Sequence, residues 1–142
     1  MIYRDFQGLK LSALGFGAMR LPVIDGDDSR IDEAAALRMV DTAMQSGVNY
    51  YDTAWGYHGE NSEKVMGKAL ARHPRNSFYV ATKFPGYDAS NWGKVREIFP
   101  KQLEKLGVDK GYALGNKQVQ AHYLLRSAYY VPLHAAGGHD TV

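Results

Sequence analysis

One short stretch, "NYYDTAWGYHGENSEKVMGKAL" at residues 49–70, holds several side chains able to do acid–base chemistry. Asp52, Trp55, Tyr57 and His58 stand together where a strand-like segment ends, and residues with helical spacing follow them. Charged and aromatic side chains at the end of a strand are commonly placed for binding or catalysis. Single residues of this kind also serve as turns, caps or surface charges.

Lys83 stands near the end of the next strand-like segment, "FYVATKF". A tyrosine hydroxyl is a weak acid with an ordinary pKa near 10, and an ammonium group beside it favours the ionised phenol. A carboxylate can keep such an ammonium charged. The trio Asp52, Tyr57 and Lys83 could therefore hand a proton to a carbonyl oxygen as hydride reaches the carbon. An alternative pairs Asp52 with His58 as metal ligands, although no other strand end supplies an acid or a histidine.

Apolar periodicity shows which elements must position these residues. The pattern predicts a hairpin, then strands that alternate with helices, which is typical of parallel α/β proteins. The expected strands cover 2–6, 9–14, 14–19, 48–54 and 77–84, and the expected helices cover 32–46, 62–72 and 94–106. Either an open doubly wound sheet or a (β/α)8 barrel would place the trio at the carboxyl ends of neighbouring strands.

Boundary residues support the helices. Ser29 followed by Asp32 resembles a helix start, while Gly47 and Gly107 stand where helices should end. Pro100 lies inside the third helix and should kink or divide it.

The segment "GFGAMR" invites comparison with the glycine-rich dinucleotide fingerprint. It lacks the third glycine, and no helix opens directly after it. Together with "GVNYYDTAWGYHGENSEKVMGKAL" and "FYVATKF", however, the segment "LGFGAMRLP" resembles the N-terminal part of the aldo-keto reductase family, over about residues 2–109. The resemblance implies a (β/α)8 barrel closed at its base by an N-terminal hairpin. It also implies reduction of an aldehyde or ketone with NADPH or NADH.

The resemblance further implies a role for each residue. Tyr57 would donate the proton, Lys83 would tune it, and Asp52 would hold Lys83. The expected cofactor-binding residues are Gly17, Ala18, Met19, Arg20 and Asp52. Trp55 is expected to form a wall of the substrate pocket, with a loop aromatic that covers the core as the alternative, and His58 is interpreted as a loop residue.

Composition excludes several other classes of protein. The 142 residues suit one domain, and a net charge of +2 gives no reason to expect nucleic acid or an anionic membrane as a partner. There is no cysteine, so disulfides and thiolate metal sites are excluded. Because no signal-like or bilayer-length apolar segment is present, we expect a cytoplasmic protein. The small-molecule carbonyl substrate is what the resemblance implies.

The pattern changes near residue 109. Residues 1–109 hold 14 acidic and 14 basic side chains, whereas 110–142 hold one acid and three bases. Residues 110–142 show neither the expected fourth strand nor the strand-end histidine that the resemblance implies, since His122 and His134 stand at the wrong distance. We therefore expect an N-terminal partial barrel at 1–109 and an aberrant tail at 110–142, with a shifted reading frame as the hypothesis for its origin.

Three strands and a hairpin would leave strand edges and apolar helix faces uncovered. We expect weak or absent turnover and poor cofactor binding from these residues alone. The alternative function is that of a non-catalytic barrel fragment that self-associates or binds a partner.

Overall fold

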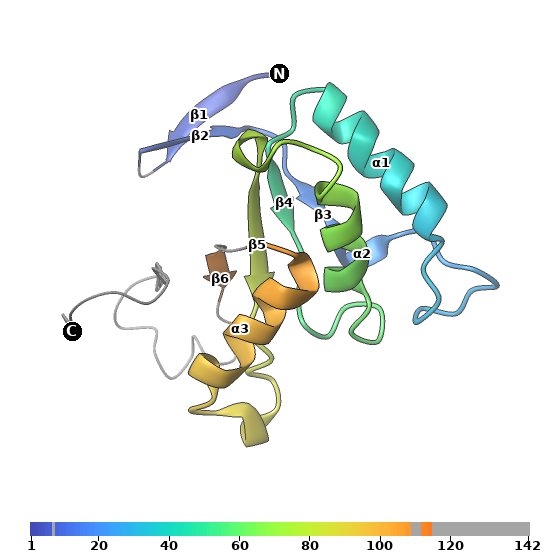
Figure 1. The fold of residues 1–142 in the computed structure, drawn as a ribbon, viewed down its shortest axis with the longest axis vertical. Coiled ribbons are helices and arrows are strands. Elements are labelled where there is room, and N and C mark those ends of the chain that lie inside the picture. Colours follow the sequence, from blue (N-terminus) through green and yellow to red (C-terminus); the bar gives the residue numbers. More distant parts are fainter. Residues whose placement is uncertain (7, 109–111, 115–142) are drawn as a thin grey trace.

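Strands and helices alternate along the chain in the computed structural model, which describes residues 1–6, 8–108 and 112–114 (Figure 1). The strands are β1 (Tyr3–Phe6), β2 (Leu9–Ser12), β3 (Phe16–Gly17), β4 (Tyr50–Asp52), β5 (Tyr79–Lys83) and β6 (Tyr112–Leu114). The helices are α1 (Glu33–Gln45), α2 (Ser62–Leu70) and α3 (Val95–Leu106), with short 3-10 turns η1 (Ala18–Arg20), η2 (Arg75–Ser77) and η3 (Ala89–Asn91).

The described strands form a two-stranded hairpin and a parallel sheet. β1 and β2 are antiparallel, and the parallel sheet has the order β3-β4-β5-β6. Figure 1 shows the hairpin at the end of the sheet where the parallel strands begin. Asn49, just before β4, fixes it there: its side chain accepts a hydrogen bond from the Ser12 amide (2.7 Å) and donates to the Lys10 carbonyl (2.8 Å). The carboxyl ends of the parallel strands therefore lie away from the hairpin.

The hydrophobic core lies between the sheet and the helices. Alternate residues of β4 and β5, among them Tyr51 and Val80, point from the sheet towards α1 and α2 and are fully buried. Gly67 lets α3 pack closely on α2, because a Cβ added there would lie 2.6 Å from the Lys105 carbonyl oxygen. The core's larger apolar members are Val40, Tyr51, Val65, Met66, Leu70, Val80 and Leu106.

The structure confirms the predicted hairpin and the alternation of parallel strands with helices. Gly47 and Gly107 have φ values of 86° and 63° just after α1 and α3, as expected of helix-ending glycines. The predicted start of α1 was wrong in detail. Asp32 is itself the N-cap, and its side chain accepts a hydrogen bond from the Ala35 amide (2.9 Å).

Three other predictions need correction. β3 is limited to two residues, because the chain turns into η1 at Ala18. Pro100 does not divide helix α3, which is one element across it, whereas the predicted kink stays a prediction. A proline removes one backbone hydrogen bond, and burial of neighbours such as Phe99 compensates. A fourth parallel strand does form, since β6 pairs with β5. The rest of the predicted tail lies outside the described residues.

The lengths and apolar character of the helices bear on whether one of them could span a membrane. Within the described part of the chain, no helix has the length and apolar character needed to cross a bilayer.

Candidate active site

Lys83 and Asp52 meet at the carboxyl ends of adjacent strands. Asp52 pairs with Ala81 in the parallel register, so Lys83, two residues further along β5, lies on the same face of the sheet. The Lys83 ammonium donates a hydrogen bond to Asp52 Oδ1 and another to the Thr53 carbonyl (3.1 Å). Each side chain of this ion pair is a little over one-quarter exposed, so the pair is open to small molecules at the rim.

Tyr57 reaches the same rim from the turn between β4 and α2. The Lys83 Nζ atom lies over its ring, 5.0 Å from the centroid, within the range of a cation–π contact. The structure thus brings the predicted trio together: an acid, an amine and a phenol from two strand ends and the loop that follows one of them.

His58 anchors the loop that carries Tyr57. Its buried ring accepts a hydrogen bond at Nε2 from the Leu21 amide (3.1 Å), and Nδ1 lies 2.9 Å from the Asp28 carbonyl oxygen. His58, Gly59 and Glu60 all have positive φ values, a run that needs such support. Since both ring nitrogens of His58 have partners, its interpretation as a loop residue holds and pairing with Asp52 around a metal is disfavoured. Among the described residues, no cluster of three acidic or histidine side chains suits a metal ion.

The predicted cofactor segment follows β3 at this rim. Gly17 lies opposite Asp52 in the register, and a Cβ added to it would meet nothing within 4 Å, so the backbone there is accessible. Met19 and Arg20 are exposed, whereas Ala18 is buried. An accessible backbone beside a carboxylate suits a ligand that carries hydroxyl or amide groups.

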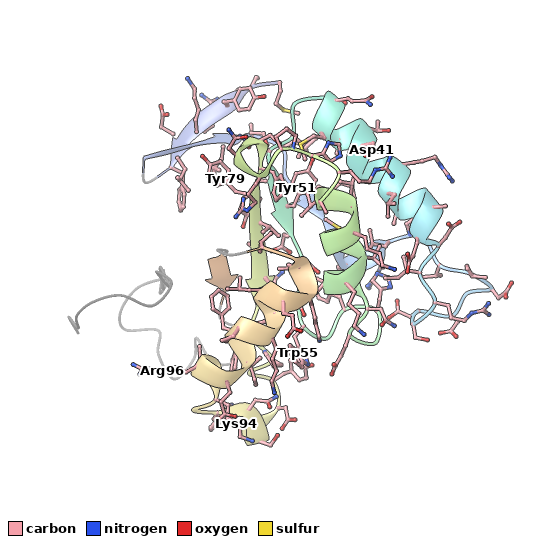
Figure 2. The ribbon with its side chains drawn as sticks, in the orientation of Figure 1. Asp41, Tyr51, Trp55, Tyr79, Lys94 and Arg96 are labelled. Carbon is pink, nitrogen blue, oxygen red and sulfur yellow. The ribbon has the colours of Figure 1, made fainter. Side chains whose placement is uncertain are left out.

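Trp55 is joined to the trio through its backbone, since its amide donates a hydrogen bond to the Lys83 carbonyl (3.3 Å). Its indole nitrogen donates to Glu60 Oε1 (2.9 Å), and the Lys105 ammonium of α3 lies 3.4 Å from its ring centroid. Figure 2 shows Trp55 beside α3 at the end of the molecule away from the hairpin. These contacts favour a loop aromatic that covers the core, and a role in the substrate pocket stays a prediction.

Sequence reasoning missed a buried polar cluster directly behind the trio. Glu63 and Gln102 are fully buried, and both contact Thr82, the residue before Lys83. Each is the polar member of an otherwise apolar helical stripe: Glu63 precedes Met66 and Leu70, and Gln102 shares the buried face of α3 with Ile98, Phe99 and Leu106. A polar residue inside an apolar stripe was the available signal.

The surroundings of Glu63 shift the pKa of its carboxyl group. Burial raises the pKa of this carboxyl, and hydrogen bonds from Thr82 and Gln102, with the Lys105 charge, offset part of the rise. Its Oε1 accepts from Thr82 Oγ1 (2.6 Å) and Gln102 Nε2 (2.8 Å), and its Oε2 lies 3.6 Å from the Lys105 ammonium.

A parallel sheet with helices on one face and an acid–amine–phenol trio at its carboxyl rim defines a barrel-type site. Comparison with known proteins agrees: the sequence profile of the Aldo/keto reductase family matches residues 13–112. The chain belongs to this family. The match ends inside β6, so it extends slightly beyond residue 109, where the sequence resemblance was placed.

Three known proteins illustrate the likeness. The chain is 39% identical over 108 residues to L-galactose dehydrogenase from Arabidopsis thaliana, which covers 72% of this chain and 33% of that protein. An aldo-keto reductase from Bacillus halodurans in its holo form matches with a TM-score of 0.65 and 28% identity, over 81% of this chain and 40% of the other. An aldo-keto reductase from Klebsiella pneumoniae in complex with NADPH matches with a TM-score of 0.64 and 19% identity, over 82% of this chain and 40% of the other.

These matches confirm the predicted fold class, a partial (β/α)8 barrel. The chain spans about a third of the length of the Arabidopsis relative. The described residues correspond to the hairpin and the first units of such a barrel.

Proposed function

We propose that this chain carries the proton-donating part of an NAD(P)H-dependent reductase that converts an aldehyde or ketone to an alcohol. Family membership supports the class of reaction. The meeting of Asp52, Lys83 and Tyr57 at one rim carries the assignment to this site. Without that meeting, three polar residues at strand ends would be ordinary surface groups.

Tyr57 donates the proton. As the substrate carbonyl becomes an alcoholate, the phenol hydrogen moves from the Tyr57 hydroxyl to the substrate oxygen, and negative charge develops on the phenol. The Lys83 ammonium stabilises that charge across the contact with the Tyr57 ring. Asp52 and the Thr53 carbonyl fix the ammonium by accepting its hydrogen bonds.

The segment 17–20, in which Gly17, Met19 and Arg20 are exposed, would hold the nicotinamide dinucleotide at the rim together with Asp52. When bound, the reduced cofactor supplies the hydride for the substrate carbon. NADPH is the cofactor in the complex of the Klebsiella pneumoniae protein, whose likeness to this chain is one of fold. We take NADPH as the first cofactor to test, with NADH as the second.

The test compares the purified chain with its Tyr57→Phe variant. Both are incubated with NADPH and a reactive aldehyde, and the alcohol is quantified against a sample without protein. We expect slow turnover by the chain and a fall of about 100-fold or more in Tyr57→Phe, the usual contribution of a general acid. Equal rates of alcohol formation by the two proteins, above the background, would contradict the proposal.

Cofactor binding is measured separately by NADPH fluorescence. We expect weak binding, because the chain spans a third of the length of its Arabidopsis relative. Affinity in the micromolar range would show that residues 1–142 bind the cofactor well and would correct this expectation.

An apolar groove favours a second candidate, self-association of two copies of the chain. The groove, with a volume of about 560 Å³, opens between α1 and β3, which is an edge strand of the described sheet. Leu14 and Met39 on its wall are 60% and 42% exposed. Among the described residues no strand pairs with the outer edge of β3, and such an edge next to an apolar groove suits a second copy of the same surface. Its other main lining residues are Phe16, Arg38, Ala43 and Val48.

Sizing chromatography separates the two candidates. A monomer that NADPH protects from protease supports the reductase. A dimer that is indifferent to NADPH and is broken by Met39→Lys supports self-association, with exposed Ile24→Lys, outside the groove, as the control.

A further inference from the structure

Two consecutive residues in the first turn of α2, Ser62 and Glu63, are both fully buried. The first turn of a helix usually faces solvent or a capping group, and a buried carboxylate is costly unless it is well hydrogen-bonded. We call Ser62 and Glu63 the first-turn pair. Their contacts run to the ends of the three strands that carry the candidate site.

Ser62 joins the ends of β3 and β4. Its hydroxyl donates to the Ala18 carbonyl (3.1 Å) and lies 2.9 Å from Thr53 Oγ1. Ala18 directly follows Gly17 in the cofactor segment, and Thr53 directly follows Asp52. The Thr53 carbonyl is also the second acceptor of the Lys83 ammonium. One hydroxyl therefore links the backbone of the cofactor segment to the side chain of Thr53, the residue after Asp52.

Glu63 holds the end of β5. Thr82 Oγ1 donates to its Oε1 (2.6 Å), and so does Gln102 Nε2 (2.8 Å). Gln102 Nε2 also lies 3.1 Å from the Lys83 carbonyl oxygen. The backbone at Thr82 and Lys83 is thus fixed from the helix side, through one acid on α2 and one amide on α3.

The alternation of side chains along a strand explains how these contacts act on the rim. Thr53 and Thr82 point towards the helices, while Asp52 and Lys83, one residue before or after, point to the opposite face. A shift of either threonine moves its neighbour at the rim. Because Gly67 allows α3 to approach α2 closely, Gln102 of α3 can reach Glu63.

We propose that the first-turn pair are positioning residues. Ser62 and Glu63 bind the ends of β3, β4 and β5 from the helix side of the sheet. In this way they set where the cofactor segment, Asp52 and Lys83 lie relative to one another. The proposal deepens the proposed function and rests on it for its catalytic meaning. The alternative is a purely structural role, in which Ser62 and Glu63 only satisfy buried polar groups. A variant that lowers stability at a distant position would then change Lys83 as much as a variant of these contacts does.

The direct readout is the side-chain ammonium of Lys83, observed by NMR in protein labelled with ¹⁵N-lysine and assigned by its loss in Lys83→Arg. Thr82→Val keeps the shape of the side chain and removes the hydroxyl, whereas Thr82→Ser keeps the hydroxyl. Val40→Ala, on the buried face of α1, is the control for lost stability. We expect Thr82→Val to speed proton exchange of the Lys83 ammonium about tenfold and to shift its ¹⁵N signal, with little change in the other two variants.

Ser62→Ala is a second, independent variant, useful if Thr82→Val fails to fold. It should act in the same direction, because it frees Thr53, whose carbonyl is an acceptor for Lys83. If neither variant changes the Lys83 signal, or if Val40→Ala changes it as much, the positioning role is excluded.

Turnover gives a separate readout. In a chain that reduces aldehydes, Thr82→Val should lower kcat about tenfold with little change in the aldehyde KM, and Thr82→Ser should restore it. The NMR measurement needs neither cofactor nor substrate. If the Lys83 effect is seen and Tyr57→Phe reduces the aldehyde as fast as the original chain, the proposed function alone is contradicted. If Tyr57→Phe is slow and the Lys83 signal is unaffected by Thr82→Val and Ser62→Ala, the positioning role alone is contradicted.

Discussion

The ammonium of Lys83 binds the carboxylate of Asp52 across two neighbouring parallel strands, on the face of the sheet opposite the buried core. This pair places a positive charge at the carboxyl rim and holds it 5.0 Å from the centre of the Tyr57 ring. The geometry makes Asp52 a support for Lys83, and Lys83 the charged neighbour of the phenol.

Lys83→Met should therefore lower kcat/KM for an aldehyde about 100-fold, because the charge that forms on Tyr57 loses its partner. Lys83→Arg should not restore the rate, since a planar guanidinium cannot occupy the same position as an ammonium. Steady-state kinetics measure both, with Lys68→Met on the exposed side of α2 as the control. A Lys83→Met chain as active as the original would contradict the assigned role.

The raised pKa of Glu63 gives stability a dependence on pH. Because burial raises this pKa above 4.5, the folded chain holds the Glu63 proton more tightly than the unfolded chain does. The resulting stabilisation is complete below pH 4.5 and is lost as the pH rises through the folded-state pKa. Between pH 4.5 and the folded-state pKa, the original chain should become progressively less stable than Glu63→Gln.

Thermal melts at several pH values measure this difference. Exposed Glu33, which pairs with Lys68, provides the matched Glu33→Gln control and should show no comparable trend. A difference between the original chain and Glu63→Gln that stays constant with pH would mean that the Glu63 pKa is not raised.

Tyr51 should control stability in alkali. Burial raises the pKa of this tyrosine to about 12, from an ordinary value of 10. The unfolded chain therefore loses this proton first, and the stabilisation present below pH 10 is lost as the pH rises towards 12. Tyr51→Phe should cost about 1 kcal/mol at neutral pH, because the hydroxyl donates to the Val48 carbonyl (3.1 Å), and should flatten the alkaline loss.

Absorbance at alkaline pH and parallel unfolding curves test this prediction. Tyr3→Phe, which removes an exposed hydroxyl that donates to the Gly47 carbonyl, serves as the comparison. If the two variants show the same alkaline behaviour, burial of Tyr51 is not the cause.

Gly67→Ala should destabilise the chain by about 1–3 kcal/mol, although alanine favours a helix more than glycine does. The added Cβ would lie 2.6 Å from the Lys105 carbonyl oxygen, and a backbone atom cannot move aside without shifting α3. Urea unfolding measures the loss, with Lys64→Ala on the exposed face of α2 as the control. A Gly67→Ala chain as stable as the original would contradict the close packing of α2 and α3.

His58→Ala should loosen the loop that carries Tyr57. The variant removes the acceptor of the Leu21 amide, and an unpaired buried donor costs about 1–3 kcal/mol. Amide hydrogen exchange at Leu21 should become faster, and aldehyde turnover should fall with it. His73→Ala, which breaks a hydrogen bond to Asp41 between α1 and the end of α2, should leave Leu21 unchanged. Unaltered exchange at Leu21 in His58→Ala would show that this anchor is dispensable.

Sequence alone was sufficient where local chemistry decides the outcome. Gly47 and Gly107 end helices because glycine adopts positive φ without steric cost, and the spacing of apolar residues identified α1, α2 and α3. The order of elements also placed Asp52, Tyr57 and Lys83 at one rim, since consecutive parallel strands share their carboxyl end. The resemblance to aldo-keto reductases rested on these same residues.

The rest depended on contacts between segments far apart in the chain. Nothing local in "KGYALG" predicts a strand, and β6 forms by pairing with the edge of β5. Likewise, the burial of Glu63 is decided by Thr82, Gln102 and the close approach of α3. Periodicity records which face of a helix is apolar, but the partner of a polar residue on that face is fixed only when two helices and a strand pack together, because hydrogen bonds depend on distance in space and not along the chain.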